Sequence, residues 1–207
     1  MNGGGKMDNI SQKNSNRELI LKAAEEVFSK KGLYGARVDE IASLSGVNKR
    51  LIYKEFESKE ELYKVVLHDS YAKMAKAESK IFADYKTSSE AIENVIRMYF
   101  EFLKDNPTYI NLILWENLNR GQYINEMDLS DVKTKVMDYM YSVLSKGKEK
   151  GEFKEDIDEN QVVFSIMTFT FSYFSNRYTM SNFLKENIDF DKRVKNVTQM
   201  ILSHIKK

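Results

Sequence analysis

The sequence predicts an all-α protein, and three observations support this prediction. The 207 residues include one proline, Pro107, and nine glycines, so few residues interrupt regular structure. Apolar residues recur at helical spacing along the chain, and no strand-like alternation persists. Apolar residues make up 42% of the chain and charged residues 30%, which is ordinary for a protein with a buried core. The apolar rows predict about nine helices.

The first helix is expected from about Ser15 to Lys31, because Ile20, Val27 and Phe28 fall on one face. Gly32 suits the position just past the end of this helix. Residues 1–13 are interpreted as a disordered arm, and they lack the apolar core of a signal peptide. The sequence does not tell whether residues 1–6 are native or a cloning remnant.

The next stretch predicts a helix-turn-helix. Residues 38–44 form a short helix, and a second one follows Asn48, which is expected to cap it. Gly46 lies between them, where a residue free to take positive φ allows a sharp reversal. Two short helices joined in this way can place the second helix in the major groove of DNA. A capping box of the form S-x-x-E, from Ser58 to Glu61, begins a long fourth helix.

Apolar rows predict five more helices in the remaining chain. They are expected over residues 92–103, from Asn106-Pro107 to Trp115, from Val132 to near Gly147 or Gly151, over Val162–Tyr178 and over about Asp189–Ile205. The helix at Val162–Tyr178 is apolar on nearly every side, so the chain itself or a partner chain must cover it. The last two helices are interpreted as a pair that joins two subunits. The side chains expected at that contact are Phe169, Tyr173, Val194, Val197 and Ile201.

A local basic surface surrounds the predicted turn, although the formal net charge of the chain is only +1. The candidate DNA contacts are Arg37, Asn48, Lys49, Arg50, Tyr53, Lys54 and Lys59. Lys49 or Arg50 can reach guanine, and Asn48 can contact phosphate or adenine. Tyr53 and Lys59 are expected to hold phosphate and to set the register. The competing interpretation is an ordinary solvated helix face.

Aromatic and methionine side chains from several C-terminal helices predict an adaptable apolar pocket. The candidate ligand contacts are Tyr99, Phe100, Trp115, Glu116, Asn117, Met137, Tyr141, Met167 and Phe171. Glu116 and Asn117 interrupt an apolar helix and can orient a ligand. Core packing is the alternative for all nine, and the sequence does not choose between the two.

Several classes of function are disfavoured. There are no cysteines and two histidines, His68 and His204, and no metal-ligand spacing surrounds either histidine. No glycine-rich phosphate loop is present, so neither an enzyme nor a cofactor or metal site is expected. No apolar run approaches the length of a membrane span, so no membrane contact is expected and a cytoplasmic location follows by default.

Over roughly residues 15–67 the chain resembles the TetR family of bacterial transcriptional regulators. The resemblance is carried by Ala24-x-x-x-Phe28, Lys31-Gly32, Val38-Asp39-Glu40-Ile41-Ala42, Gly46-Val47-Asn48, Leu51-Ile52-Tyr53 and Phe56-x-Ser58-Lys59-Glu60-x-Leu62. Four positions depart from the family pattern. Arg37 stands where threonine is frequent, Glu55 stands where tyrosine or histidine is frequent, and Arg50-Leu51 replaces a frequent Gly-Thr.

The resemblance implies a DNA-binding domain over residues 14–60 and a ligand-binding and dimerisation domain over residues 61–207. It implies a homodimer joined through the last two helices, bound to a near-palindromic double-stranded operator as a repressor. A small-molecule effector, which the sequence does not identify, would release the operator. The alternative is a helical ligand-binding or adaptor protein without specific DNA binding.

Overall fold

The computed structural model describes residues 4–81, 85–130, 136–186 and 188–207, with side chains from residue 15 onward. The regular elements in these ranges are eleven α-helices and one 3-10 turn, which confirms the all-α prediction. The chain divides into two compact units. Unit 1 contains Met1–Tyr71 and Asn111–Leu129, and unit 2 contains Ala72–Ile110 and Ser130–Lys207. The sequence did not indicate that residues 111–129 belong with the N-terminal part.

Unit 1 is built from helices at two places in the sequence. They are α1 (Gly4–Gly35), α2 (Val38–Ser45), α3 (Lys49–Phe56), the first part of α4 (Lys59–Glu78), the second part of α6 (Pro107–Leu118) and α7 (Gln122–Glu126). Their apolar faces form one core, in which Phe28, Ile41, Ile52 and Leu62 are almost fully buried. An ion pair of 2.6 Å between Lys31 and Glu40 also joins α1 to α2.

Helix α1 differs from the expected helix at both ends. It continues through residues 4–14, where the sequence predicts a disordered arm. No proline interrupts that stretch, and its asparagine, glutamine and lysine residues are tolerated in a helix. At the other end Gly32 has non-helical dihedral angles (φ 64°, ψ 178°), so the regular helix bends at the place where the sequence predicts its end.

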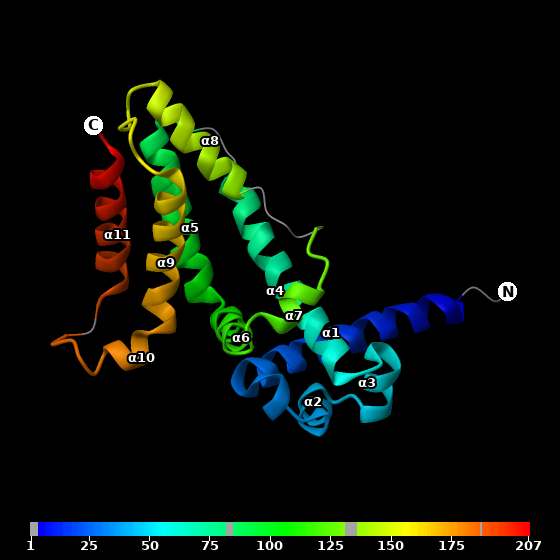
Figure 1. Ribbon diagram of the computed structural model, residues 1–207. Helices are drawn as coiled ribbons and strands as arrows, with labels where there is room; N and C mark the ends of the chain where they lie inside the picture. Colours follow the sequence, from blue (N-terminus) through cyan, green and yellow to red (C-terminus); the bar gives the residue numbers. More distant parts are fainter. Residues whose placement is uncertain (1–3, 82–84, 131–135, 187) are drawn as a thin grey trace. The chain divides into compact units, whose positions relative to one another are not determined.

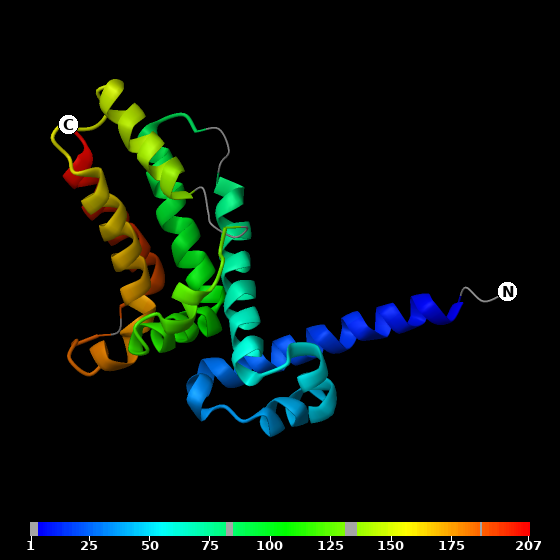
Figure 2. The ribbon, with the colours of Figure 1, turned by 45° about the vertical axis from the view of Figure 1, so that its right-hand side comes forward.

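Unit 2 is a helical bundle. It contains the end of α4, the 3-10 turn η1 (Ser79–Ile81), α5 (Ser88–Asp105), the start of α6, α8 (Val136–Glu149), α9 (Glu159–Ser175), α10 (Arg177–Met180) and α11 (Phe190–Ile205). Helix α5 is central and packs against α8, α9 and α11, and α9 and α11 lie side by side (Figures 1 and 2). Ile92, Ile96, Phe100 and Ile166 are fully buried between these helices.

The described helices of unit 2 differ from the predicted ones in detail. Val132, expected to start a helix, lies outside the described residues. The predicted helix over Val162–Tyr178 is two helices, because α9 ends at Ser175 and the short α10 follows.

The apolar stripe of the last helix has a different role from the expected one. Val194, Val197 and Ile201 are at most 5% exposed, because α5 and α9 of the same chain cover them. They are core residues, and the prediction that they form the subunit contact is revised. Phe169 and Tyr173 are half-buried on α9, so part of each remains accessible.

The end of the chain is tied to the loop after α8. Phe153 pairs with Lys206 in an isolated antiparallel bridge, and the Lys154 amide donates to the Ile205 carbonyl over 2.8 Å. The Phe153 ring is fully buried and lies directly against Gly147 of α8. A side chain at residue 147 has no space, which explains a glycine inside this helix.

We expect Gly147→Ala to destabilise unit 2, because the added methyl group would overlap the Phe153 ring. Overpacking of this kind lowers the free energy of unfolding by about 1–3 kcal/mol. Urea unfolding followed by circular dichroism measures the change. Gly35→Ala is the control, since its methyl group would meet its nearest atom, in Lys31, at 3.4 Å. Equal urea midpoints for Gly147→Ala and the unmodified protein would contradict this packing.

Candidate nucleic-acid interface

The turn between α2 and α3 has the predicted geometry. Gly46 ends α2 in the left-handed region (φ 70°). A Cβ atom added to Gly46 would have no atom within 4 Å apart from those of its chain neighbours. Asn48 caps α3, because its side-chain oxygen accepts from the Leu51 amide over 2.9 Å. Ile52 and Phe56 of α3 are buried in unit 1. These contacts fix which side of α3 faces outward.

The outward side of α3 carries two neighbouring rows of side chains. Residues four apart lie above one another on a helix, so Lys49 and Tyr53 form one row, and Arg50 and Lys54 form the other. All four side chains are exposed, as are Arg37 and Asn48, while Lys59 is half-buried. Leu51 is half-buried and belongs to the inner side of the helix.

One of these rows borders a hollow of about 450 Å³ in unit 1. Four of the seven predicted contacts, Arg37, Lys49, Tyr53 and Lys59, line it. Arg37 directly precedes α2, Lys49 and Tyr53 lie on α3, and Lys59 begins α4. The fold therefore brings together residues from three places in the sequence. Glu57 and Glu60 lie at the same hollow and limit its positive charge. Arg50, Lys54 and Asn48 are not among its lining residues.

Hydrogen bonds hold two of the cations in place. Lys49 pairs with Asp39 of α2 over 2.9 Å, and this hydrogen bond raises the pKa of Lys49, so the amine stays charged. The Lys59 amine donates to the Ala36 carbonyl over 3.2 Å. Ser58 caps α4 as predicted, because its hydroxyl accepts from the Glu61 amide over 3.0 Å.

Trp115, one of the nine candidate ligand contacts, joins α6 to α1 within unit 1. Its indole N–H donates to the Ser29 carbonyl over 3.2 Å. The ring lies against Gly32, where a Cβ atom would come within 2.8 Å of two ring carbons. The bend of α1 therefore makes space for this indole. The sequence pattern indicates only a helix end at Gly32 and does not reveal this contact.

Glu116 is a second anchor of the same segment. The carboxylate is 2% exposed and accepts from the Tyr63 hydroxyl over 2.9 Å. It also accepts from the amides of Tyr123 and Ile124 over 3.2 and 3.1 Å. Burial and the adjacent carboxylate raise the pKa of Tyr63. Of the two roles that the sequence leaves open for Glu116, the structure shows the bonding to neighbouring groups of the protein. Asn117 is exposed and donates to the Ile113 carbonyl.

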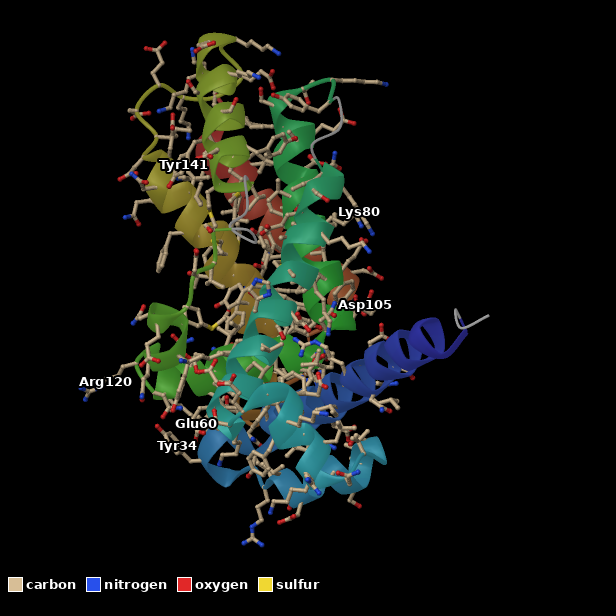
Figure 3. The ribbon with its side chains drawn as sticks, turned by 90° about the vertical axis from the view of Figure 1, so that its right-hand side faces the viewer. Tyr34, Glu60, Lys80, Asp105, Arg120 and Tyr141 are labelled. Carbon is tan, nitrogen blue, oxygen red and sulfur yellow. The ribbon has the colours of Figure 1, made fainter. Side chains whose placement is uncertain are left out.

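The other six candidate ligand contacts lie in unit 2, and their environments differ. The Tyr99 hydroxyl donates to the buried Glu78 carboxylate over 2.8 Å, and Phe100 packs edge-on against Tyr173. Tyr141 lies on α8 (Figure 3), and its hydroxyl donates to Asn160 over 2.8 Å. Met167 is 37% exposed, while Met137 and Phe171 are half-buried. Their role in binding a ligand stays a prediction.

Other site chemistry is limited in the described ranges. No group of three histidine, aspartate or glutamate side chains in them is placed to hold a metal ion. None of their helices combines the length and hydropathy that a membrane span needs.

An exposed basic helix held behind a glycine turn, joined to a helical bundle, defines a helix-turn-helix regulatory protein. Family models agree with this class: residues 20–66 match bacterial regulatory proteins of the tetR family, and residues 89–205 match the tetracyclin repressor-like C-terminal domain. The chain therefore belongs to the TetR family of DNA-binding transcriptional regulators. A helical adaptor without DNA binding is not favoured.

Individual relatives are similar over nearly the whole chain. The HTH-type transcriptional repressor NicS of Pseudomonas putida is 31% identical over 185 residues, which span 89% of this chain and 87% of that protein. The HTH-type transcriptional regulator RutR of Escherichia coli is 29% identical over 92% of this chain and 90% of its own. A TetR regulator from Chloroflexus aurantiacus has the same fold, with a TM-score of 0.74 at 15% identity, covering 95% of this chain and 98% of its own.

We expect Gly32→Ala to disturb Trp115, the single tryptophan of the chain. The new methyl group meets the indole ring, and the positive φ adds strain, so unfolding should become easier by about 2 kcal/mol. The emission maximum of Trp115 should shift in the folded protein. Gly46→Ala is the control, because it carries the same φ strain with no neighbouring atom and should leave the emission unchanged. Identical emission in both variants would contradict the Trp115–Gly32 contact.

Proposed function

We propose that the protein is a homodimeric repressor that binds a near-palindromic operator and leaves it when a small molecule binds. In this proposal α3 enters the major groove, as the second helix of a helix-turn-helix does. Two copies reading the same face of DNA require half-sites one helical turn, about 34–36 Å, or a multiple of it apart. The proposed place of action is the cytoplasm, and binding and release of DNA require no catalytic step.

The observation that carries this proposal is that the side chains predicted to contact DNA form two groups. Arg37, Lys49, Tyr53 and Lys59 surround one hollow, which suits a phosphate of the DNA backbone. Arg50 and Lys54 form the adjacent exposed row, and an arginine there can bond the O6 and N7 atoms of guanine. The first group would fix the register, and the second would read the sequence.

Dimerisation is supported by apolar side chains that the chain leaves exposed on α9 and α11. Phe164 is 66% exposed, Met167 37% and Met200 43%. Phe164 and Met167 are three residues apart and share one face of α9. Exposed apolar surface can mark an interaction site, and on the last two long helices we assign it to a second copy of the chain. These three side chains, together with the accessible parts of Phe169 and Tyr173, replace the buried residues of α11 as the proposed dimer contact.

The repressing sign is proposed from the similarity to a repressor, and the release by ligand is proposed from the C-terminal domain that the chain shares with the family. The proposed mechanism is a shift of population, in which the ligand binds more tightly to the form of the dimer that does not fit the operator.

Arg50→Ala should weaken binding to the specific operator by about 1–3 kcal/mol and should change binding to random DNA little, because a base contact is lost. Lys59→Ala should weaken binding to both and should flatten the dependence of affinity on salt, because a phosphate contact is lost. Fluorescence anisotropy with an operator fragment selected from the source genome measures both effects.

Lys192→Ala, on the exposed side of α11, removes the same charge from unit 2 and serves as the control. Its affinities should equal those of the unmodified protein. Equal losses on both DNAs for Arg50→Ala would assign Arg50 to phosphate. Affinity of the unmodified protein that does not depend on salt would refute DNA binding altogether.

A further inference from the structure

A cavity of about 650 Å³ lies in unit 2 between the end of α9, the short α10 and the start of α11. The chain turns back from α10 toward α11 at this place (Figure 1). A volume of this size fits a small organic molecule. None of the nine side chains that the sequence predicts to contact a ligand lines it. The lining combines aromatic and aliphatic side chains with two guanidinium groups.

The apolar part of the lining is unusually exposed. Tyr178 is 73% exposed, Met180 48%, Leu184 42% and Ile188 46%. All four line the cavity and lie within one short stretch of the chain. Clustered exposed apolar side chains mark a binding surface more often than scattered ones do. An apolar body placed in the cavity would remove this surface from water.

The cations of the lining are Arg177 and Arg193. Arg177 lies 4.6 Å over the Tyr178 ring, and Arg193 lies 5.9 Å from the centre of the Phe169 ring. Within the described ranges no ion pair joins either guanidinium to a carboxylate. The Asp189 carboxylate at the start of α11 caps that helix by accepting from the Lys192 amide. Partial burial lowers the pKa of Arg193, as expected for a cation whose hydration is incompletely replaced.

We propose that this cavity binds a small organic anion with an apolar body, whose carboxylate or similar group is held by Arg177 and Arg193. Planar guanidinium groups bind carboxylates through paired hydrogen bonds, and such bonds are strongest where water is partly excluded. The apolar body lies against Tyr178, Met180 and Leu184.

The inference does not depend on the proposed function, and isothermal titration calorimetry of the full chain tests it. Decanoate is the probe, and decanamide is its neutral counterpart. We expect decanoate to bind at least tenfold more tightly than decanamide. Arg193→Gln and Arg177→Gln should each weaken decanoate binding about tenfold and should leave decanamide binding unchanged.

Lys195→Gln is the matched control, because it removes an exposed cation of α11 that does not line the cavity. It should bind decanoate as the unmodified protein does, and all three variants should keep the thermal transition of the unmodified protein. Equal binding of decanoate and decanamide would overturn the proposal, as would no binding of decanoate because a second copy fills the cavity. Operator affinity is measured separately, so a failed titration beside intact operator binding would refute only this site.

Discussion

The organisation of unit 1 depends on one buried charge, the carboxylate of Glu116. A carboxylate that is 2% exposed is costly unless donors surround it, and Tyr63 together with the amides of Tyr123 and Ile124 supplies them. These donors determine where residues 111–129 lie. Helix α6 begins in unit 2, and its second part, which contains Glu116, belongs to unit 1. One continuous helix therefore belongs to both units.

The basic surface follows from the packing behind it. Burial of Ile52 and Phe56 fixes the rotation of α3, and Gly46 permits the reversal that brings α3 across α2. The outward rows then have different surroundings: Lys49 pairs with Asp39 beside the hollow, whereas Arg50 lies on the adjacent row. This difference makes a phosphate-contacting and a base-contacting role separable by experiment, although both groups of side chains are basic and exposed.

Local sequence signals predicted the fold and the exposed face of α3 well, whereas long-range contacts could not be predicted. A glycine turn, an asparagine cap and a serine cap act within a few residues, and all three are present. The contact of Trp115 with Gly32 and that of Glu116 with Tyr63 join residues far apart in the sequence, and helical periodicity carries no information on such pairs. For the same reason the apolar stripe of α11 did not reveal whether its own chain or a partner covers it.

Hydroxyl-radical footprinting on a fragment selected from the source genome tests the central claim most directly, because it maps the sugar-phosphate contacts of the bound protein. The account predicts two protected patches related by the symmetry of the operator, on one face of the DNA and separated by one helical turn or a multiple of it. The contact surface of a single unit 1, with one exposed α3, is expected to give one patch. Uniform protection along the fragment, or no protection at concentrations that saturate binding, would contradict a paired helix-turn-helix reader.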